Sequence, residues 1–97
     1  MMKNNEKIIQ SIMDAIDEIN ETYPKDKRLE KSVDTILTGE LGILDSLGII
    51  MFIVAVEERI RNDMGLSISL ADEIGKIDGA LRTPETLANF IVNELQS

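Results

Sequence analysis

Ser46 is the residue whose type and position could support chemistry. It stands in the segment Gly42-Ile43-Leu44-Asp45-Ser46-Leu47-Gly48, where a loop meets a long apolar stretch. A serine at a helix start can present its hydroxyl group for covalent attachment, with apolar residues just beyond it. The same position has a structural explanation, because Asp45 and Ser46 are both preferred N-cap types that satisfy the free amides of a first helical turn. The local pair alone leaves both interpretations open.

The composition disfavours most enzyme classes. The chain has no cysteine and no histidine, which removes disulfides, thiolate nucleophiles, ordinary zinc ligands and the commonest general base. Ser46 also has no lysine near it in sequence that could act as its base, so a serine hydrolase is disfavoured. The acidic residues lack the regular spacing of an EF-hand loop, which argues against a dedicated metal site. We therefore predict a protein that is not an enzyme and holds no metal.

Charge and length restrict the partners and the location. A net charge of −8 and a pI near 4.4 repel nucleic acid and anionic lipid, so basic protein surfaces are the natural complement. The N-terminal residues are too polar for a signal peptide, and the longest apolar run, Leu47 to Val56, is too short to cross a bilayer. The 97 residues suit a single domain over 1–97. We expect a cytoplasmic monomer.

Hydrophobic periodicity predicts an all-α fold. The first helix should end before Tyr23-Pro24, and its apolar stripe consists of Ile8, Ile12, Ile16 and Ile19. The second should run from Asp45 or Ser46 to about Asn62, near Gly65, and a short third should cover about 72–77. The last should begin at Thr83-Pro84, with an apolar face of Leu87, Phe90, Ile91 and Leu95. A long loop joins the first two helices. Within it Leu29, Val33, Ile36 and Leu37 keep helical spacing, which predicts a short extra helix, and Leu41, Ile43 and Leu44 should fix its end to the core. The expected architecture is a small four-helix bundle of three longer helices and one short one.

The second predicted helix has two apolar stripes. The first comprises Ile49, Phe52, Ile53, Val56 and Ile60 and is sufficient to face a core. The second comprises Leu47, Ile50, Met51 and Val54 and is displaced around the helix. Either the third helix and the long loop cover this second stripe, or it forms an exposed docking patch beside Ser46. The following pair, Glu57 and Glu58, is typical of a solvated helix face.

The serine segment, the helix after it and the helix order together resemble the acyl carrier protein family, including peptidyl and aminoacyl carrier domains. The resemblance covers roughly Ile8 to Leu95, but only Asp45-Ser46-Leu47 and its flanks are specific. It implies that a phosphopantetheinyl transferase attaches 4′-phosphopantetheine from coenzyme A to Ser46 and releases 3′,5′-ADP. The chain would then hold acyl groups as thioesters on a thiol that the prosthetic group supplies.

The resemblance also implies a partner surface. Asp45 would help the modifying enzyme to recognise the serine, Leu47, Ile50, Met51 and Val54 would give apolar contacts, and Glu57 and Glu58 acidic ones. Fatty acid carriers usually have acidic residues two and five places after the serine, where this chain has Gly48 and Met51. These departures favour a specialised lipid or secondary-metabolite pathway or a D-alanyl carrier, loaded by an adenylate-forming acyl or aminoacyl ligase and served by acyltransferases or condensing enzymes. Whether an acyl chain enters the bundle, and what residues 22–39 do, stays open.

A second hypothesis belongs to a different class of protein. A small helical adaptor without a prosthetic group would dock its partners through Leu47, Ile50, Met51 and Val54 and would use Ser46 only as a helix cap. Changing Ser46 to alanine would abolish modification of a carrier, whereas an adaptor would lose only the stability of the cap.

Overall fold

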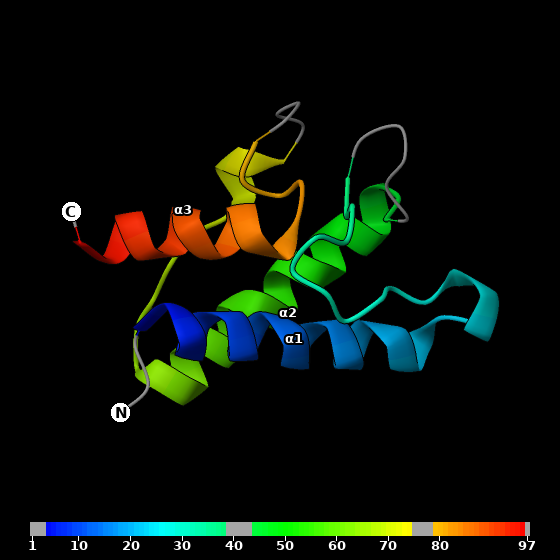
Figure 1. The fold of residues 1–97 in the computed structure, drawn as a ribbon, viewed down its shortest axis with the longest axis horizontal. Helices are drawn as coiled ribbons and strands as arrows, with labels where there is room; N and C mark the ends of the chain where they lie inside the picture. Colours follow the sequence, from blue (N-terminus) through cyan, green and yellow to red (C-terminus); the bar gives the residue numbers. More distant parts are fainter. Residues whose placement is uncertain (1–3, 39–43, 75–78, 97) are drawn as a thin grey trace.

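The chain folds into α-helices joined by irregular segments (Figure 1). The computed structural model describes residues 4–38, 44–74 and 79–96. In this part of the chain there are three α-helices, α1 (Asn4–Thr22), α2 (Ser46–Met64) and α3 (Pro84–Gln96), with two 3-10 helices, η1 (Lys25–Lys27) and η2 (Ala71–Glu73), and no strand. The predicted all-α class is therefore confirmed.

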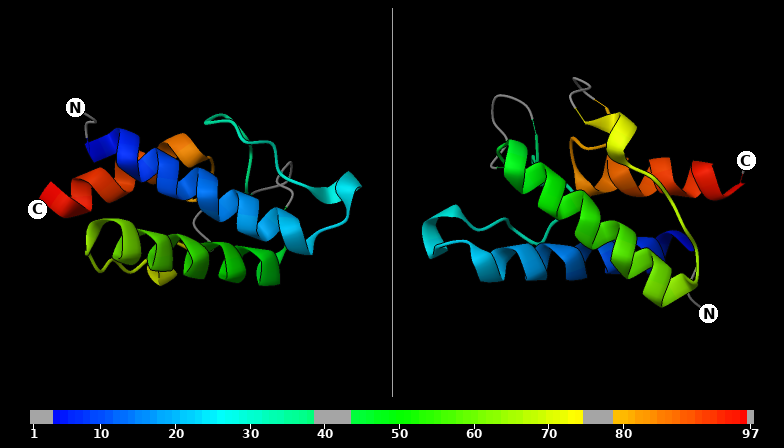
Figure 2. Two further views of the ribbon diagram at one scale, coloured as in Figure 1. Left: turned by 90° about the horizontal axis from the view of Figure 1, so that it is seen from below. Right: turned by 180° about the vertical axis from the view of Figure 1, so that it is seen from behind.

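The α1 helix packs against both other helices. It runs antiparallel to α3, and α2 crosses it on another side (Figures 1 and 2). Its predicted isoleucine stripe is fully buried, and the helix ends before Tyr23-Pro24 as the sequence indicates. The core consists of aliphatic side chains with a single buried phenylalanine: Ile8, Ile12, Ala15, Ile16, Ile19, Leu29, Leu37, Leu44, Phe52, Ile53, Ala55, Val56, Ile60, Leu70, Leu81, Leu87, Ala88 and Ile91. One continuous core thus stabilises all three helices.

Local signals set the ends of α2 and α3. Gly65 adopts the left-handed conformation, with φ of 69°, and its amide donates to the carbonyl of Arg61 at 2.9 Å, which ends α2 near the predicted position. At the start of α3, the hydroxyl of Thr83 accepts from the amide of Thr86 at 3.1 Å, and the hydroxyl of Thr86 accepts from the amide of Thr83 at 3.0 Å. Pro84 follows as the first helical residue. The predicted cap at Thr83-Pro84 is confirmed.

The predicted extra helix over Leu29 to Leu37 is wrong. Residues 28–38 form turns and irregular backbone, and η1 lies before them. The backbone groups of this segment bond instead to the start of α3 and the residues just before it: Leu37 N–H donates to the carbonyl of Arg82 at 2.7 Å, and Glu85 N–H donates to that of Val33 at 3.1 Å. These long-range bonds replace the local ones that a helix would need. Leu29 and Leu37 are buried, while Val33 and Ile36 are half-buried.

In the described residues, the predicted short third helix is reduced to one 3-10 turn. Its described part contains the single turn η2, followed by extended Ile74, and 75–78 lie outside the described residues. A fourth α-helix is therefore absent from the described part of the chain. Leu41 and Ile43 also lie outside it, whereas Leu44 is buried as predicted and its amide donates to the carbonyl of Leu37 at 3.2 Å.

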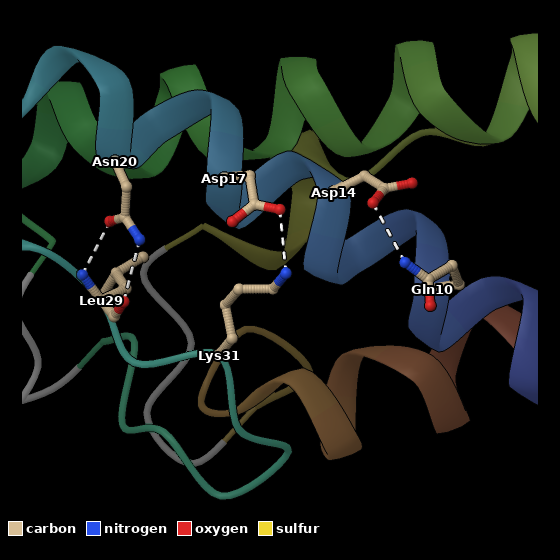
Figure 3. Close-up of polar contacts among 6 residues, drawn as sticks. All are labelled: Gln10, Asp14, Asp17, Asn20, Leu29 and Lys31. Atoms are coloured by element: carbon tan, nitrogen blue, oxygen red, sulfur yellow. Dashed lines mark hydrogen bonds and ion pairs between the residues drawn. The ribbon is translucent and has the colours of Figure 1, made fainter.

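The chain after α1 is fixed to that helix by side-chain contacts (Figure 3). The Asn20 side chain donates to the carbonyl of Leu29 at 2.9 Å and accepts from its amide at 2.8 Å, so that one side chain satisfies both backbone groups of a buried residue. Nearby, Lys31 forms an ion pair with Asp17 at 2.9 Å, but both side chains are about half exposed, so this pair contributes little. The Asn20 bridge is the stronger attachment.

We expect the substitution Asn20→Ala to lower the free energy of unfolding by about 1–3 kcal/mol, because it leaves the buried amide and carbonyl of Leu29 without their partner. Urea denaturation would measure the change. A matched control is Gln10→Ala, which removes only an exposed side-chain hydrogen bond to Asp14 on the same helix (Figure 3) and should cost less than about 0.5 kcal/mol. Equal effects of the two substitutions would contradict the structural role of the bridge.

None of the described helices is both long enough and apolar enough to cross a bilayer.

Candidate functional site

Asp45 caps α2, and Ser46 is the first residue of the helix. The backbone of Asp45 is extended, with φ of −82° and ψ of −176°, and its Oδ1 accepts from the amide of Gly48 at 2.7 Å. This is the geometry of an N-cap. Of the two cap candidates that the sequence leaves open, Asp45 therefore fills the role, and Ser46 occupies the next position.

The electrostatic surroundings of the helix start suit an anion. The first turn of α2 contains no acidic residue, and the N-terminus of a helix presents unbonded N–H groups and the positive end of the helix dipole. The adjacent carboxylate of Asp45 is a like charge, which its hydrogen bond to Gly48 partly offsets. Asp45 and Leu47, the neighbours of Ser46 in sequence, are both exposed.

Part of the second apolar stripe of α2 is exposed. Leu47 is 66% exposed, Ile50 48% and Val54 47%, and we call these three residues the exposed row. Met51, the fourth member of the predicted stripe, is half-buried and packs against the core. In the first stripe Phe52, Ile53, Val56 and Ile60 are buried, and Ile49 is half-buried. The described residues therefore leave one apolar strip uncovered, beginning next to Ser46.

Glu57 and Glu58 differ in their burial and in their hydrogen bonding. Glu57 is half-buried, and its Oε2 accepts from the amide of Leu70 at 2.9 Å, at the start of η2. Leu70 itself is fully buried in the core. Glu57 therefore joins α2 to the chain that follows it, and Glu58 is the exposed carboxylate of the pair. The simple solvated face that the sequence predicts for both residues applies to Glu58 alone.

We expect Glu57→Ala to lower the free energy of unfolding by about 1–3 kcal/mol, because the amide of Leu70 loses its charged acceptor. Glu58→Ala removes the same kind of side chain from an exposed neighbouring position and should change it by less than about 0.5 kcal/mol. Thermal or urea unfolding of the two variants side by side would measure the difference. A Glu57→Ala protein as stable as the wild type would contradict the assignment.

Tyr23 belongs to this site, which the sequence analysis missed. A Cβ atom at Gly48 would overlap the hydroxyl oxygen of Tyr23 and would lie 3.1 Å from Oδ1 of Asp45. Burial, and secondly the carboxylate of Asp45, raise the pKa of Tyr23 above its ordinary value. Two sequence signals were available: this is the only tyrosine in the chain, and a glycine stands within the first turn of a helix. Neither signal indicates that the two residues meet.

Other candidate sites in the described part of the chain are weaker. A depression of about 530 Å³ lies between the chain after α2 and the second half of α3, and its lining residues are Ser67, Ile68, Ser69, Asp72, Glu73, Phe90, Glu94 and Leu95. None of them belongs to the α2 start. Within the described residues, no group of three or more Asp or Glu side chains is arranged to hold a metal ion.

Comparison with known proteins does not define this chain further, since no family model, no curated protein and no solved structure matches it.

Proposed function

We propose that this chain is an acyl carrier protein that holds a 4′-phosphopantetheine group on Ser46. The observation that supports the proposal best is that Asp45 caps α2, so that Ser46 is not needed as the cap and stands beside the exposed row. The motif Asp45-Ser46-Leu47 and the all-helical fold agree with the resemblance to carrier proteins. The proposal includes the four-helix bundle that the resemblance implies, of which the described residues contain three α-helices and the turn η2.

The proposed attachment is a phosphoryl transfer. The oxygen of Ser46 forms a bond to the phosphorus that bears the pantetheine arm of coenzyme A, and the pyrophosphate bond to 3′,5′-ADP breaks. The hydroxyl proton leaves to a base of the transferase, because the chain has no histidine to accept it. The products are a phosphodiester on Ser46 and 3′,5′-ADP. When bound, the prosthetic group supplies the thiol that holds an acyl or aminoacyl group as a thioester.

The surroundings of Ser46 fit such a group. Its sequence neighbours Asp45 and Leu47 are exposed, so the segment is accessible to another enzyme. The helix start favours a phosphodiester anion, since the first turn has no acidic residue and the carboxylate of Asp45 is engaged by the amide of Gly48. Leu47 and Ile50 give the approaching enzyme an apolar contact in the first two turns of α2.

The proposed partners follow from the exposed row and from the sequence differences between this chain and the fatty acid carriers. A transferase modifies Ser46, an adenylate-forming ligase loads the acyl or aminoacyl group, and an acyltransferase or condensing enzyme receives it. Gly48 and Met51 stand where acidic residues are usual in those carriers, which favours a specialised lipid or secondary-metabolite pathway or D-alanyl transfer. The proposed carrier acts as a cytoplasmic monomer that binds neither nucleic acid nor membrane.

The intact mass of the purified protein tests the proposal. The protein is weighed before and after incubation with coenzyme A, magnesium and a promiscuous phosphopantetheinyl transferase, and fragmentation locates any added group. We expect one phosphopantetheinyl group on Ser46 and none on the exposed Ser67 or Ser69. A folded protein that gains no mass, while a control carrier is modified, would overturn the proposal.

The exposed row favours one other function. A helical adaptor without a prosthetic group would dock a partner through Leu47, Ile50 and Val54, all of which are uncovered in the described structure. It would gain no mass in the same experiment. The adaptor is therefore the function that a negative result would support.

A further inference from the structure

The start of α2 is in contact with the end of α1. Tyr23 follows the last residue of α1, and its hydroxyl oxygen lies against Gly48, in the first turn of α2. Figure 2 shows these two helix ends at the same end of the molecule. The first turn of α2 is thus in contact with the residue that follows α1 and not only with its own helix.

The contact is close enough that any side chain at position 48 would displace the hydroxyl end of Tyr23. Gly48 is buried, and a Cβ atom there would overlap the oxygen of Tyr23 and lie 3.2 Å from a methyl group of Leu44. The amide of the same residue donates to the carboxylate of Asp45. The hydroxyl oxygen of Tyr23 and the cap carboxylate of Asp45 therefore both lie next to Gly48, in the turn that begins at Ser46.

We propose that Tyr23 is a positioning residue for the modification of Ser46. By packing on Gly48, its hydroxyl end holds the first turn of α2 and Asp45 in the placement that the transferase recognises. This inference rests on the proposed attachment at Ser46. The first turn of a helix lacks part of its internal hydrogen bonds, and packing from outside limits its motion. Phosphoryl transfer depends strongly on the placement of the attacking oxygen, and an error of about 1 Å can cost about a hundredfold in rate.

A rescue experiment tests the inference. Gly48→Ala places a methyl group against the oxygen of Tyr23, and Tyr23→Phe removes that oxygen while keeping the ring. We expect Gly48→Ala to reduce kcat for modification by at least about tenfold, with little change in KM because the exposed row is intact. Adding Tyr23→Phe should restore kcat to within about threefold of the Tyr23→Phe protein. Alanine is a better helix former than glycine, so helix propensity does not explain a loss, and a loss that Tyr23→Phe reverses comes from the collision with Tyr23.

The outcomes separate this inference from the proposed function. A wild-type protein that gains no group overturns both. A wild-type protein that is modified, with a Gly48→Ala variant equally fast or one that Tyr23→Phe does not rescue, overturns the positioning role alone. Circular dichroism of each variant identifies a loss of folding.

A second measurement needs no variant. Tyr23 is the only tyrosine and the chain has no tryptophan, so an ultraviolet absorbance titration reports on this side chain alone. Among the described residues, two charged groups interact with it: the carboxylate of Asp45, and Arg28, whose Nε donates to the Tyr23 carbonyl at 3.2 Å. A phosphodiester on Ser46 adds a negative charge at the same helix start, so the pKa of Tyr23 should rise further after modification. An identical titration before and after modification would show that Tyr23 does not sense the site and would overturn the inference.

Discussion

Replacing Ser46 with alanine should abolish the gain of a phosphopantetheinyl group and leave the stability of the fold almost unchanged. The attacking oxygen is lost completely, so no slower reaction remains. Alanine is well tolerated at the first position of a helix, and the cap hydrogen bond belongs to Asp45. The free energy of unfolding should therefore change by less than about 0.5 kcal/mol.

The matched variant is Asp45→Ala, which should show the opposite pattern. It removes the cap of α2 and should lower the free energy of unfolding by about 0.5–2 kcal/mol. It keeps the serine oxygen, so modification should continue at a reduced rate. Intact mass and urea denaturation of both variants would give the comparison. A Ser46→Ala protein that is still modified would show that the group is attached to a residue other than Ser46.

Two carboxylates in the exposed row should reduce modification strongly without unfolding the protein. In the double variant Leu47→Asp/Ile50→Asp, we expect kcat/KM of the transferase to fall by at least about tenfold, because the enzyme loses two apolar contacts and meets charge in their place. Both side chains are about half exposed or more, so their burial contributes little to the core. Steady-state kinetics and thermal unfolding would measure the two effects separately.

A charge-matched control distinguishes contact from net charge. Asn62→Asp/Asn93→Asp adds the same two negative charges at exposed positions of α2 and α3. It should leave kcat/KM within about threefold of the wild type, because long-range effects of exposed charges are screened by salt. Equal losses in the two double variants would mean that total charge and not the exposed row determines recognition.

The sequence predicts most of what is local in this fold. The isoleucine spacing of α1, the left-handed stop at Gly65 and the cap at Thr83-Pro84 all depend on residues within one or two turns of each other. The exposed row was also accessible to prediction, because helical periodicity alone shows that α2 has more apolar surface than one core face needs.

The errors have a common physical origin, which is bonding between distant parts of the chain. Residues 28–38 keep a helical spacing of apolar side chains, but their backbone groups bond to Arg82 and Glu85 and the Asn20 side chain binds Leu29. Similarly, nothing in the sequence places Tyr23 against Gly48. Spacing reports which residues share a face and does not report which remote segment competes for their hydrogen bonds.

The antiparallel arrangement of α1 and α3 has a practical consequence for handling the protein. The start of α1 and the end of α3 lie together at one end of the molecule, and the start of α2 lies toward the other (Figure 1). A tag or surface tether joined at either terminus should therefore lie away from the start of α2. Immobilised protein should remain open to large enzymes, so that binding and turnover can be followed on a sensor surface.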